Sequence, residues 1–182
     1  MESDETLFLR VREGDIAAFD RLYERYERRL FTYVLAMLRD RRDAEEVFHD
    51  AFLAALKDAA PTFEDGGFRA WLYRVARNIA LNRKRSRDRH DRNVASAEPF
   101  VAPSSNKTAD RLIEARELDT ALLAAVARLP HALGELYHLR ADGLSYEQIA
   151  NVIDVPLGTV KSRMHQMVHA LRQELSPWIA PK

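Results

Sequence analysis

Apolar residues recur at three- and four-residue steps over most of the chain, a period typical of helices that bury one face. The first apolar stripe runs from Ile16 to Met37, and the second runs from Ala44 to Ala55, before Pro61. A third begins at Phe68 and continues into a basic segment. No window of β-branched alternation competes with this helical pattern. We therefore expect an all-α protein.

The helical pattern fails between residues 93 and 107, where NVASAEPFVAPSSNK contains two prolines and three serines. A segment of this composition buries too little apolar surface to offset its ordering entropy, which is typical of a flexible linker. Helical periodicity resumes near Asp110. The sequence thus predicts two small helical domains, 1–92 and 110–182, joined by a flexible linker at 93–109.

The C-terminal domain has the signals of a helix-turn-helix. Ser145 and Gln148 form a capping box at the start of a short helix, which ends in a turn at 154–156. The next helix buries a stripe from Val160 to Leu175. Its opposite face carries small and hydrogen-bonding residues suited to base edges in the major groove, flanked by cations suited to phosphates: Thr159, Lys161, Ser162, Arg163, His165 and Gln166. A helical hairpin that only packs is the alternative.

The formal net charge of zero conceals a segregation of charge along the chain. Residues 1–68 carry 10 Lys/Arg and 16 Asp/Glu, whereas residues 69–92 carry nine and two. The basic helix and the loop before it, which holds Phe63, also bear rings and amides, and this mixture suits single-stranded nucleic acid: Phe63, Trp71, Arg74, Asn78 and Arg85. Core packing is the alternative for Trp71, and a solvated helix face is the alternative for the basic run.

The helix before it carries an acidic stripe of Asp43, Glu46 and Asp50, three to four residues apart. Nothing in the sequence gathers a pocket around these carboxylates, so a basic protein partner is the functional interpretation. The alternative is a merely solvated surface.

Several other classes of protein fit the sequence poorly. No apolar run is long enough to cross a membrane, no secretory signal is visible, and no cysteine is present for disulfides or thiolate sites. His165 and His169 have the spacing of a zinc-hydrolase helix, but Gln166 stands where that chemistry needs a Glu. We expect a cytoplasmic protein that is not an enzyme and has neither metal nor cofactor.

Three segments together resemble the extracytoplasmic-function (ECF) class of bacterial RNA polymerase sigma factors: FDRLYERYERRLFTYVLAMLRDRRDAEEVFHDAFLAAL, FRAWLYRVARNIALNRKR and GLSYEQIANVIDVPLGTVKSRMHQMVHALRQEL. The resemblance implies an initiation factor whose first domain binds core RNA polymerase and opens the −10 promoter element. The second domain would read the −35 element as duplex, and an anti-sigma factor is the implied inhibitor. The alternative is a stand-alone helix-turn-helix regulator, which would bind DNA tightly without polymerase.

Carried over by position, the resemblance assigns three sets of residues. The polymerase-binding helix would use Asp43, Glu45, Glu46 and Asp50. The −10 segment would use Phe63, Trp71, Arg74, Asn78, Asn82, Arg83 and Arg85. The −35 helix would use Thr159, Lys161, Ser162, Arg163, His165 and Gln166. Arginine is common in the family at the position of Gln166, which implies an altered −35 preference here.

Overall fold

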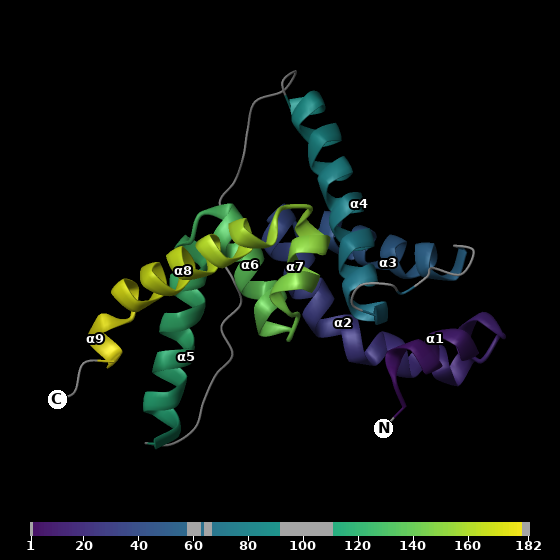
Figure 1. Cartoon of the computed structure of the whole chain (residues 1–182), viewed down its shortest axis with the longest axis horizontal. Helices are drawn as coiled ribbons and strands as arrows, with labels where there is room; N and C mark the ends of the chain where they lie inside the picture. The colour runs from purple at the N-terminus through teal and green to yellow at the C-terminus, as the bar shows by residue number, and fades with distance from the viewer. Residues whose placement is uncertain (1, 58–62, 64–66, 92–110, 180–182) are drawn as a thin grey trace.

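The computed structural model describes residues 2–57, 63, 67–91 and 111–179, and every regular element in these ranges is helical. The helices (Figure 1) are α1 (Asp4–Arg12), α2 (Ile16–Leu38), α3 (Arg41–Lys57), α4 (Gly67–Asp91), α5 (Arg111–Arg128), α6 (His131–Ala141), α7 (Tyr146–Ile153), α8 (Leu157–Glu174) and α9 (Ser176–Ile179). The predicted all-α class is confirmed. The predicted linker, 93–109, lies outside the described residues.

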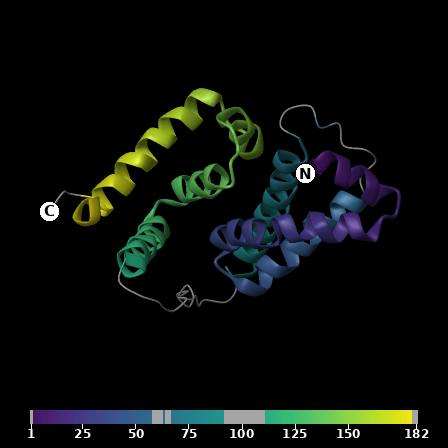
Figure 2. The same ribbon diagram turned by 90° about the horizontal axis from the view of Figure 1, so that it is seen from below.

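Helices α1–α4 form one group, in which α2 packs against α1, α3 and α4. Figure 2 shows this group on one side of the molecule and α5–α8 on the other. The stripe predicted along α2 supplies much of the core, because Leu22, Leu30 and Val34 are at most 2% exposed. Ile16, at the start of that stripe, is instead exposed. The helix ends where Arg39 adopts a left-handed conformation.

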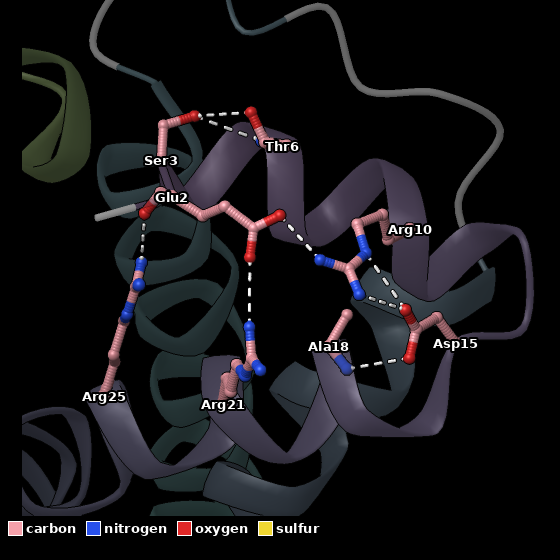
Figure 3. Close-up of polar contacts among 8 residues, drawn as sticks. All are labelled: Glu2, Ser3, Thr6, Arg10, Asp15, Ala18, Arg21 and Arg25. Atoms are coloured by element: carbon pink, nitrogen blue, oxygen red, sulfur yellow. Dashed lines mark hydrogen bonds and ion pairs between the residues drawn. The ribbon is translucent and has the colours of Figure 1, made fainter.

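Helix α1 was not predicted by the sequence pattern, and polar contacts fix it against α2 (Figure 3). Glu2 accepts hydrogen bonds from Arg10 at 2.6 Å and from Arg21 at 3.1 Å. Asp15 accepts from the Arg10 guanidinium and also from the Ala18 backbone N–H, so it caps α2 while holding α1. The hydrogen bond from the Arg10 guanidinium contributes most to lowering the pKa of the Asp15 carboxyl. The turn between α1 and α2 is therefore held by charge as well as by packing.

The apolar side of α1 faces the same core. Leu7, Phe8 and Val11 are buried, whereas Leu9 between them is 60% exposed. At the other end of the group, the Glu5 carboxylate accepts the Phe68 backbone N–H at 3.0 Å, so a side chain of α1 satisfies a free amide in the first turn of α4. Helix α1 thus positions the start of α4.

The helix-turn-helix predicted near the C-terminus is present as α7 and α8. Both halves of the capping box form, with the Ser145 hydroxyl accepting from the Gln148 N–H and the Gln148 side chain accepting from the Ser145 N–H. Asp154 ends α7 in a left-handed conformation with φ of 54°. Ile149 and Val160 are fully buried where α7 packs on α8. The predicted turn chemistry is confirmed.

Candidate nucleic-acid interface

The face of α8 opposite its buried stripe is open to solvent near the N-terminus of the helix. Val160, Met164 and Met167 are at most 6% exposed and fix the rotation of the helix about its axis. With that rotation, the predicted −35 residues fall into two groups. Lys161, Ser162, His165 and Gln166 are exposed, whereas Thr159 and Arg163 are half-buried at the flanks. The exposed group offers one cation and several hydrogen-bonding side chains, which is a surface suited to a DNA groove.

Helix α4 presents a second polar stripe of cations and amides. Its exposed members are spaced four, four and three residues apart, which places them on one helix face: Arg74, Asn78, Asn82 and Arg85. Figure 1 shows the C-terminal part of α4 extending beyond the other helices. This part of the predicted −10 surface is accessible as the structure stands.

Trp71 and Phe63 do not lie on that exposed stripe but in an aromatic cluster under α1. The Trp71 ring centroid is 6.0 Å from that of Phe8, 5.8 Å from that of Phe68 and 6.3 Å from that of Phe63. Trp71 is 8% exposed. In this arrangement the ring packs in the core, the alternative that sequence reasoning held open. Phe8, which covers the cluster, was missed because its helix was missed.

The predicted acidic and basic surfaces contact each other. The Arg83 guanidinium of α4 donates to Asp43 at 2.9 Å and also to Glu46, both on α3. Arg87 donates to Asp43 at 3.3 Å. The hydrogen bonds that Arg83 donates to the Asp43 and Glu46 carboxylates raise the pKa of the Arg83 guanidinium. The charge segregation was visible in the sequence, and in the structure the two adjacent helices of opposite charge pair with each other.

The remaining predicted polymerase-binding residues point to solvent. Glu45 and Asp50 are exposed on α3, and His49 beside them bonds the Glu45 backbone carbonyl through Nδ1 at 2.8 Å. Glu45 also accepts from Arg41 one turn earlier on the same helix. The accessible acidic surface is therefore Glu45 and Asp50, with Glu46 at its edge.

Among the residues that the structure describes, no group of three His, Cys, Asp or Glu side chains is arranged to hold a metal ion. His165 and His169 are both exposed on α8. Within the same ranges, no helix has the length and apolar character needed to cross a membrane.

Comparison with known proteins gives a consistent result along the chain. Residues 22–90 match the family described as Sigma-70 region 2, and residues 119–168 match Sigma-70, region 4. The RNA polymerase sigma-H factor of Pseudomonas aeruginosa is 32% identical over 97% of this chain and 95% of its own. The ECF RNA polymerase sigma-E factor of Escherichia coli K12 is also 32% identical, over 97% and 96%.

Two solved structures share the fold at 22% sequence identity. One is CnrH in complex with the cytosolic domain of CnrY, with a TM-score of 0.61 over 97% of this chain and 99% of that one. The other is the sigma factor RpoE of Bartonella quintana in complex with the anti-sigma factor NepR, with a TM-score of 0.64 over 87% and 96%.

Proposed function

Because the chain belongs to the ECF class of RNA polymerase sigma factors, we propose a division of labour between its two helical groups. As a sigma factor it binds core RNA polymerase and directs promoter-specific initiation. Residues 1–92 bind the polymerase and open the −10 element, residues 93–109 connect, and residues 110–182 read the −35 element. Sigma factors are generally non-enzymatic, and we propose that this chain acts in the cytoplasm without catalysis of its own.

The observation that carries this proposal is the exposed polar face of α8. Gln166 lies one turn after Ser162 on that face, so it reaches a base edge when the helix enters the major groove. Glutamine pairs best with adenine, whereas arginine reads guanine, and a good bidentate pair discriminates by about 1–3 kcal/mol. Lys161 and Arg163 flank the face and hold phosphates, which adds affinity without sequence preference.

Transcription from a promoter library randomised across the −35 element tests this assignment. Gln166→Arg shifts the preferred base at one position, and Lys161→Ala lowers activity evenly and reduces the salt dependence. Gln173→Arg is the matched control, because Gln173 is exposed on the same helix beyond the proposed groove. A Gln166→Arg profile identical to that of the unmodified chain would show that this side chain contacts no base.

For the −10 element we propose that the exposed stripe of α4 follows the single strand and that Trp71 stacks on a base after α1 has moved. Base stacking on an aromatic ring contributes about 1–3 kcal/mol. Asn78→Ala and Trp71→Ala then impair transcription from duplex promoter more than from a template mismatched at the −10 element. Because Trp71 is buried, Trp71→Ala could act through the core instead. If Trp71→Ala lowers transcription equally on both templates while Asn78→Ala does not, the Trp71 ring serves the core alone.

For core polymerase we propose that Glu45 and Asp50 provide the accessible acidic contact, with Asp43 and Glu46 joining once Arg83 is released. Glu45→Lys/Asp50→Lys therefore weakens a pull-down of core polymerase without changing helicity. Glu24→Lys, on the exposed side of α2, makes the matched change of charge elsewhere. If Glu45→Lys/Asp50→Lys binds core polymerase as well as Glu24→Lys does, the polymerase contact does not lie on this face of α3.

The two solved structures suggest a further partner, since one holds CnrH with the cytosolic domain of CnrY and the other holds the sigma factor RpoE with the anti-sigma factor NepR. We propose that this chain is also held by a protein inhibitor. Co-purification of the full chain with a protein that prevents its binding to core polymerase is the test. A stand-alone regulator, the competing function, would bind promoter DNA tightly without polymerase, and a gel-shift assay with and without polymerase separates the two.

A further inference from the structure

A cavity of about 340 Å³ lies where the end of α2, the start of α3 and the C-terminal part of α4 meet the first residue of α6. Helices α2, α3 and α4 pack on one another, and α6 packs on α2 (Figure 1). Pockets for small molecules have volumes of about 300–1,000 Å³, so this cavity is large enough for a small ligand. Apart from Asp43, no residue of the proposed DNA and polymerase surfaces lines it.

Three cationic side chains line the cavity. Lys84 and Arg87 lie one turn apart on α4, and Arg39 directly follows the end of α2. Arg87 donates to the Asp43 Oδ2 at 3.3 Å, which fixes its guanidinium. Neither the Arg39 guanidinium nor the Lys84 ammonium has an ion pair or a hydrogen bond with another residue that the structure describes. Two of the three cations are therefore available to a ligand.

The carboxylates of the lining do not balance these cations. Asp43 is also neutralised from outside the cavity, because the Arg83 Nε donates to its Oδ1 at 2.9 Å. Asp88 is the other carboxylate among the described lining residues. The cavity therefore keeps an excess of positive charge. A concave surface with one prevailing sign of charge concentrates ions of the opposite sign, so an anion is the ligand that this lining favours.

Arg39 occupies a backbone position that does not favour arginine. Its φ of 54° and ψ of 23° are left-handed at the C-cap of α2, where glycine is usual because it has no β-carbon. Residues other than glycine in such conformations concentrate at functional sites. The cap itself uses only the backbone, since the Arg39 N–H donates to the Leu35 carbonyl at 2.8 Å. The arginine side chain is thus not needed for the cap, and it lines the cavity.

His131 supplies the part of the lining that comes from the second helical group. Two ion pairs hold its helix, α6, and the turn after it against the first group. The Arg77 Nε donates to Glu135 at 2.7 Å, and the Arg29 Nη1 donates to Asp142 at 2.9 Å. The two carboxylate side chains are only 8% and 4% exposed. These contacts keep the wall at His131 in place, so the cavity is formed before any ligand binds.

We propose that this cavity binds a small molecule that carries a phosphate chain and an apolar ring, the chemistry of a nucleotide. A phosphate group carries about 1.5–2 negative charges near neutral pH and three acceptor oxygens, which suits cations that converge from separate elements. Arg39 and Lys84 hold the phosphates. Met37 and Leu38, which are 5% and 7% exposed, form the apolar part of the lining and contact the ring. This inference does not rest on the proposed function.

Isothermal titration of the full-length chain with ATP and with pyrophosphate, both without divalent cations, tests the proposal. ATP is expected to bind with a Kd below about 1 mM, and more tightly than pyrophosphate, which has no ring. Arg39→Gly/Lys84→Ala should weaken ATP binding by about tenfold. Absence of ATP binding, or an unchanged affinity in this variant, would overturn the proposal. Pyrophosphate binding as tight as that of ATP would overturn the assignment to a nucleotide.

Two controls separate the cavity from general charge and from folding. Arg28→Ala/Lys57→Ala removes two positive charges from exposed positions outside the lining, and it should leave the affinity for ATP unchanged. An equal loss in both double variants would reduce the binding to a general charge effect. Arg39→Gly alone should melt no lower than the unmodified chain, because glycine accepts the left-handed conformation. A lower midpoint would contradict the argument from the backbone at Arg39.

Methyl-labelled methionine locates the bound ligand. Met37 lines the cavity, whereas Met164 and Met167 are buried on α8, away from it. ATP is expected to shift the methyl resonance of Met37, assigned through Met37→Leu, and to leave the two α8 resonances unchanged. A shift confined to the α8 methyl groups would overturn the location. A single-stranded oligonucleotide that shifts Met37 where ATP does not would assign the cavity to nucleic acid and overturn the proposal of a small molecule.

Discussion

Phe8 offers the sharpest test of how α1 supports the first helical group. It is 2% exposed, and its ring centroid lies 5.4 Å from that of Phe63, 5.2 Å from that of Phe68 and 6.0 Å from that of Trp71. Truncating a buried phenylalanine costs about 3–5 kcal/mol, because apolar contacts are lost and a cavity remains. The three aromatic contacts place Phe8→Ala toward the upper part of that range. Such a loss is a large share of a small domain's stability.

Equilibrium urea unfolding followed by tryptophan fluorescence measures this loss. Trp178, the other tryptophan, is 49% exposed, so a Trp178→Phe background leaves Trp71 to report on α1–α4 alone. Leu9→Ala is the matched control, since Leu9 is 60% exposed on the same helix and should change the free energy of unfolding by less than about 0.5 kcal/mol. Phe8→Ala should also shift Trp71 emission to the red. A loss below about 1 kcal/mol with unshifted emission would refute the packing argument.

Three smaller perturbations test local features of the fold. Gly67→Ala should destabilise the fold more than Gly14→Ala does. Both glycines have positive φ, but only at Gly67 would a β-carbon clash with the Glu5 carboxylate. The midpoints of urea unfolding compare the two variants. Burial opposes ionisation of the Glu5 carboxyl, but hydrogen bonds, led by the one from the Phe68 N–H, outweigh burial and lower the pKa of Glu5. Glu5 therefore stabilises the folded state above the unfolded pKa, near 4.5. This stabilisation is lost as the pH falls through the lower pKa of the folded state. Glu5→Gln should remove that part of the acid dependence in a pH series of unfolding curves. Ser145→Ala breaks the capping box and should cost about 1 kcal/mol, measured by thermal unfolding against Ser162→Ala on the exposed face of α8.

The parts of the fold that the sequence predicted are those in which local signals and burial agree. The stripe of α2 spans more than six turns, so its apolar period is unambiguous, and the capping box at Ser145 fixes the start of α7. Helix α1 lacks both advantages. It has nine residues with three buried apolar side chains, and much of its stability comes from contacts distant in sequence, such as Glu5 with Phe68. Short helices of this kind depend on tertiary packing that periodicity does not encode.

The same gap explains what the sequence missed about the site. Trp71 lies between the core stripe and the polar stripe of α4, and the side to which it belongs is decided by Phe8 of α1. Without α1 the ring is equally compatible with a surface position. The exposed positions of α8 were predictable because its buried stripe, Val160 to Met167, is continuous and fixes the opposite face. The roles of these side chains in promoter recognition stay predictions.

Two of the ion-paired sites between helices, Arg83 with Glu46 and the pairs of Glu135 and Asp142, differ in burial, and this difference sets how each pairing is released. Arg83 and Glu46 are 38% and 50% exposed, so salt and water already screen them and a basic protein surface or a DNA phosphate can replace either partner at little cost. Glu135 and Asp142 are buried, and removing one partner by mutation strands a charge away from water. The pairs of Glu135 and Asp142 are thus sensitive to substitution on one side, whereas the exposed Arg83 pairing tolerates the exchange of a partner.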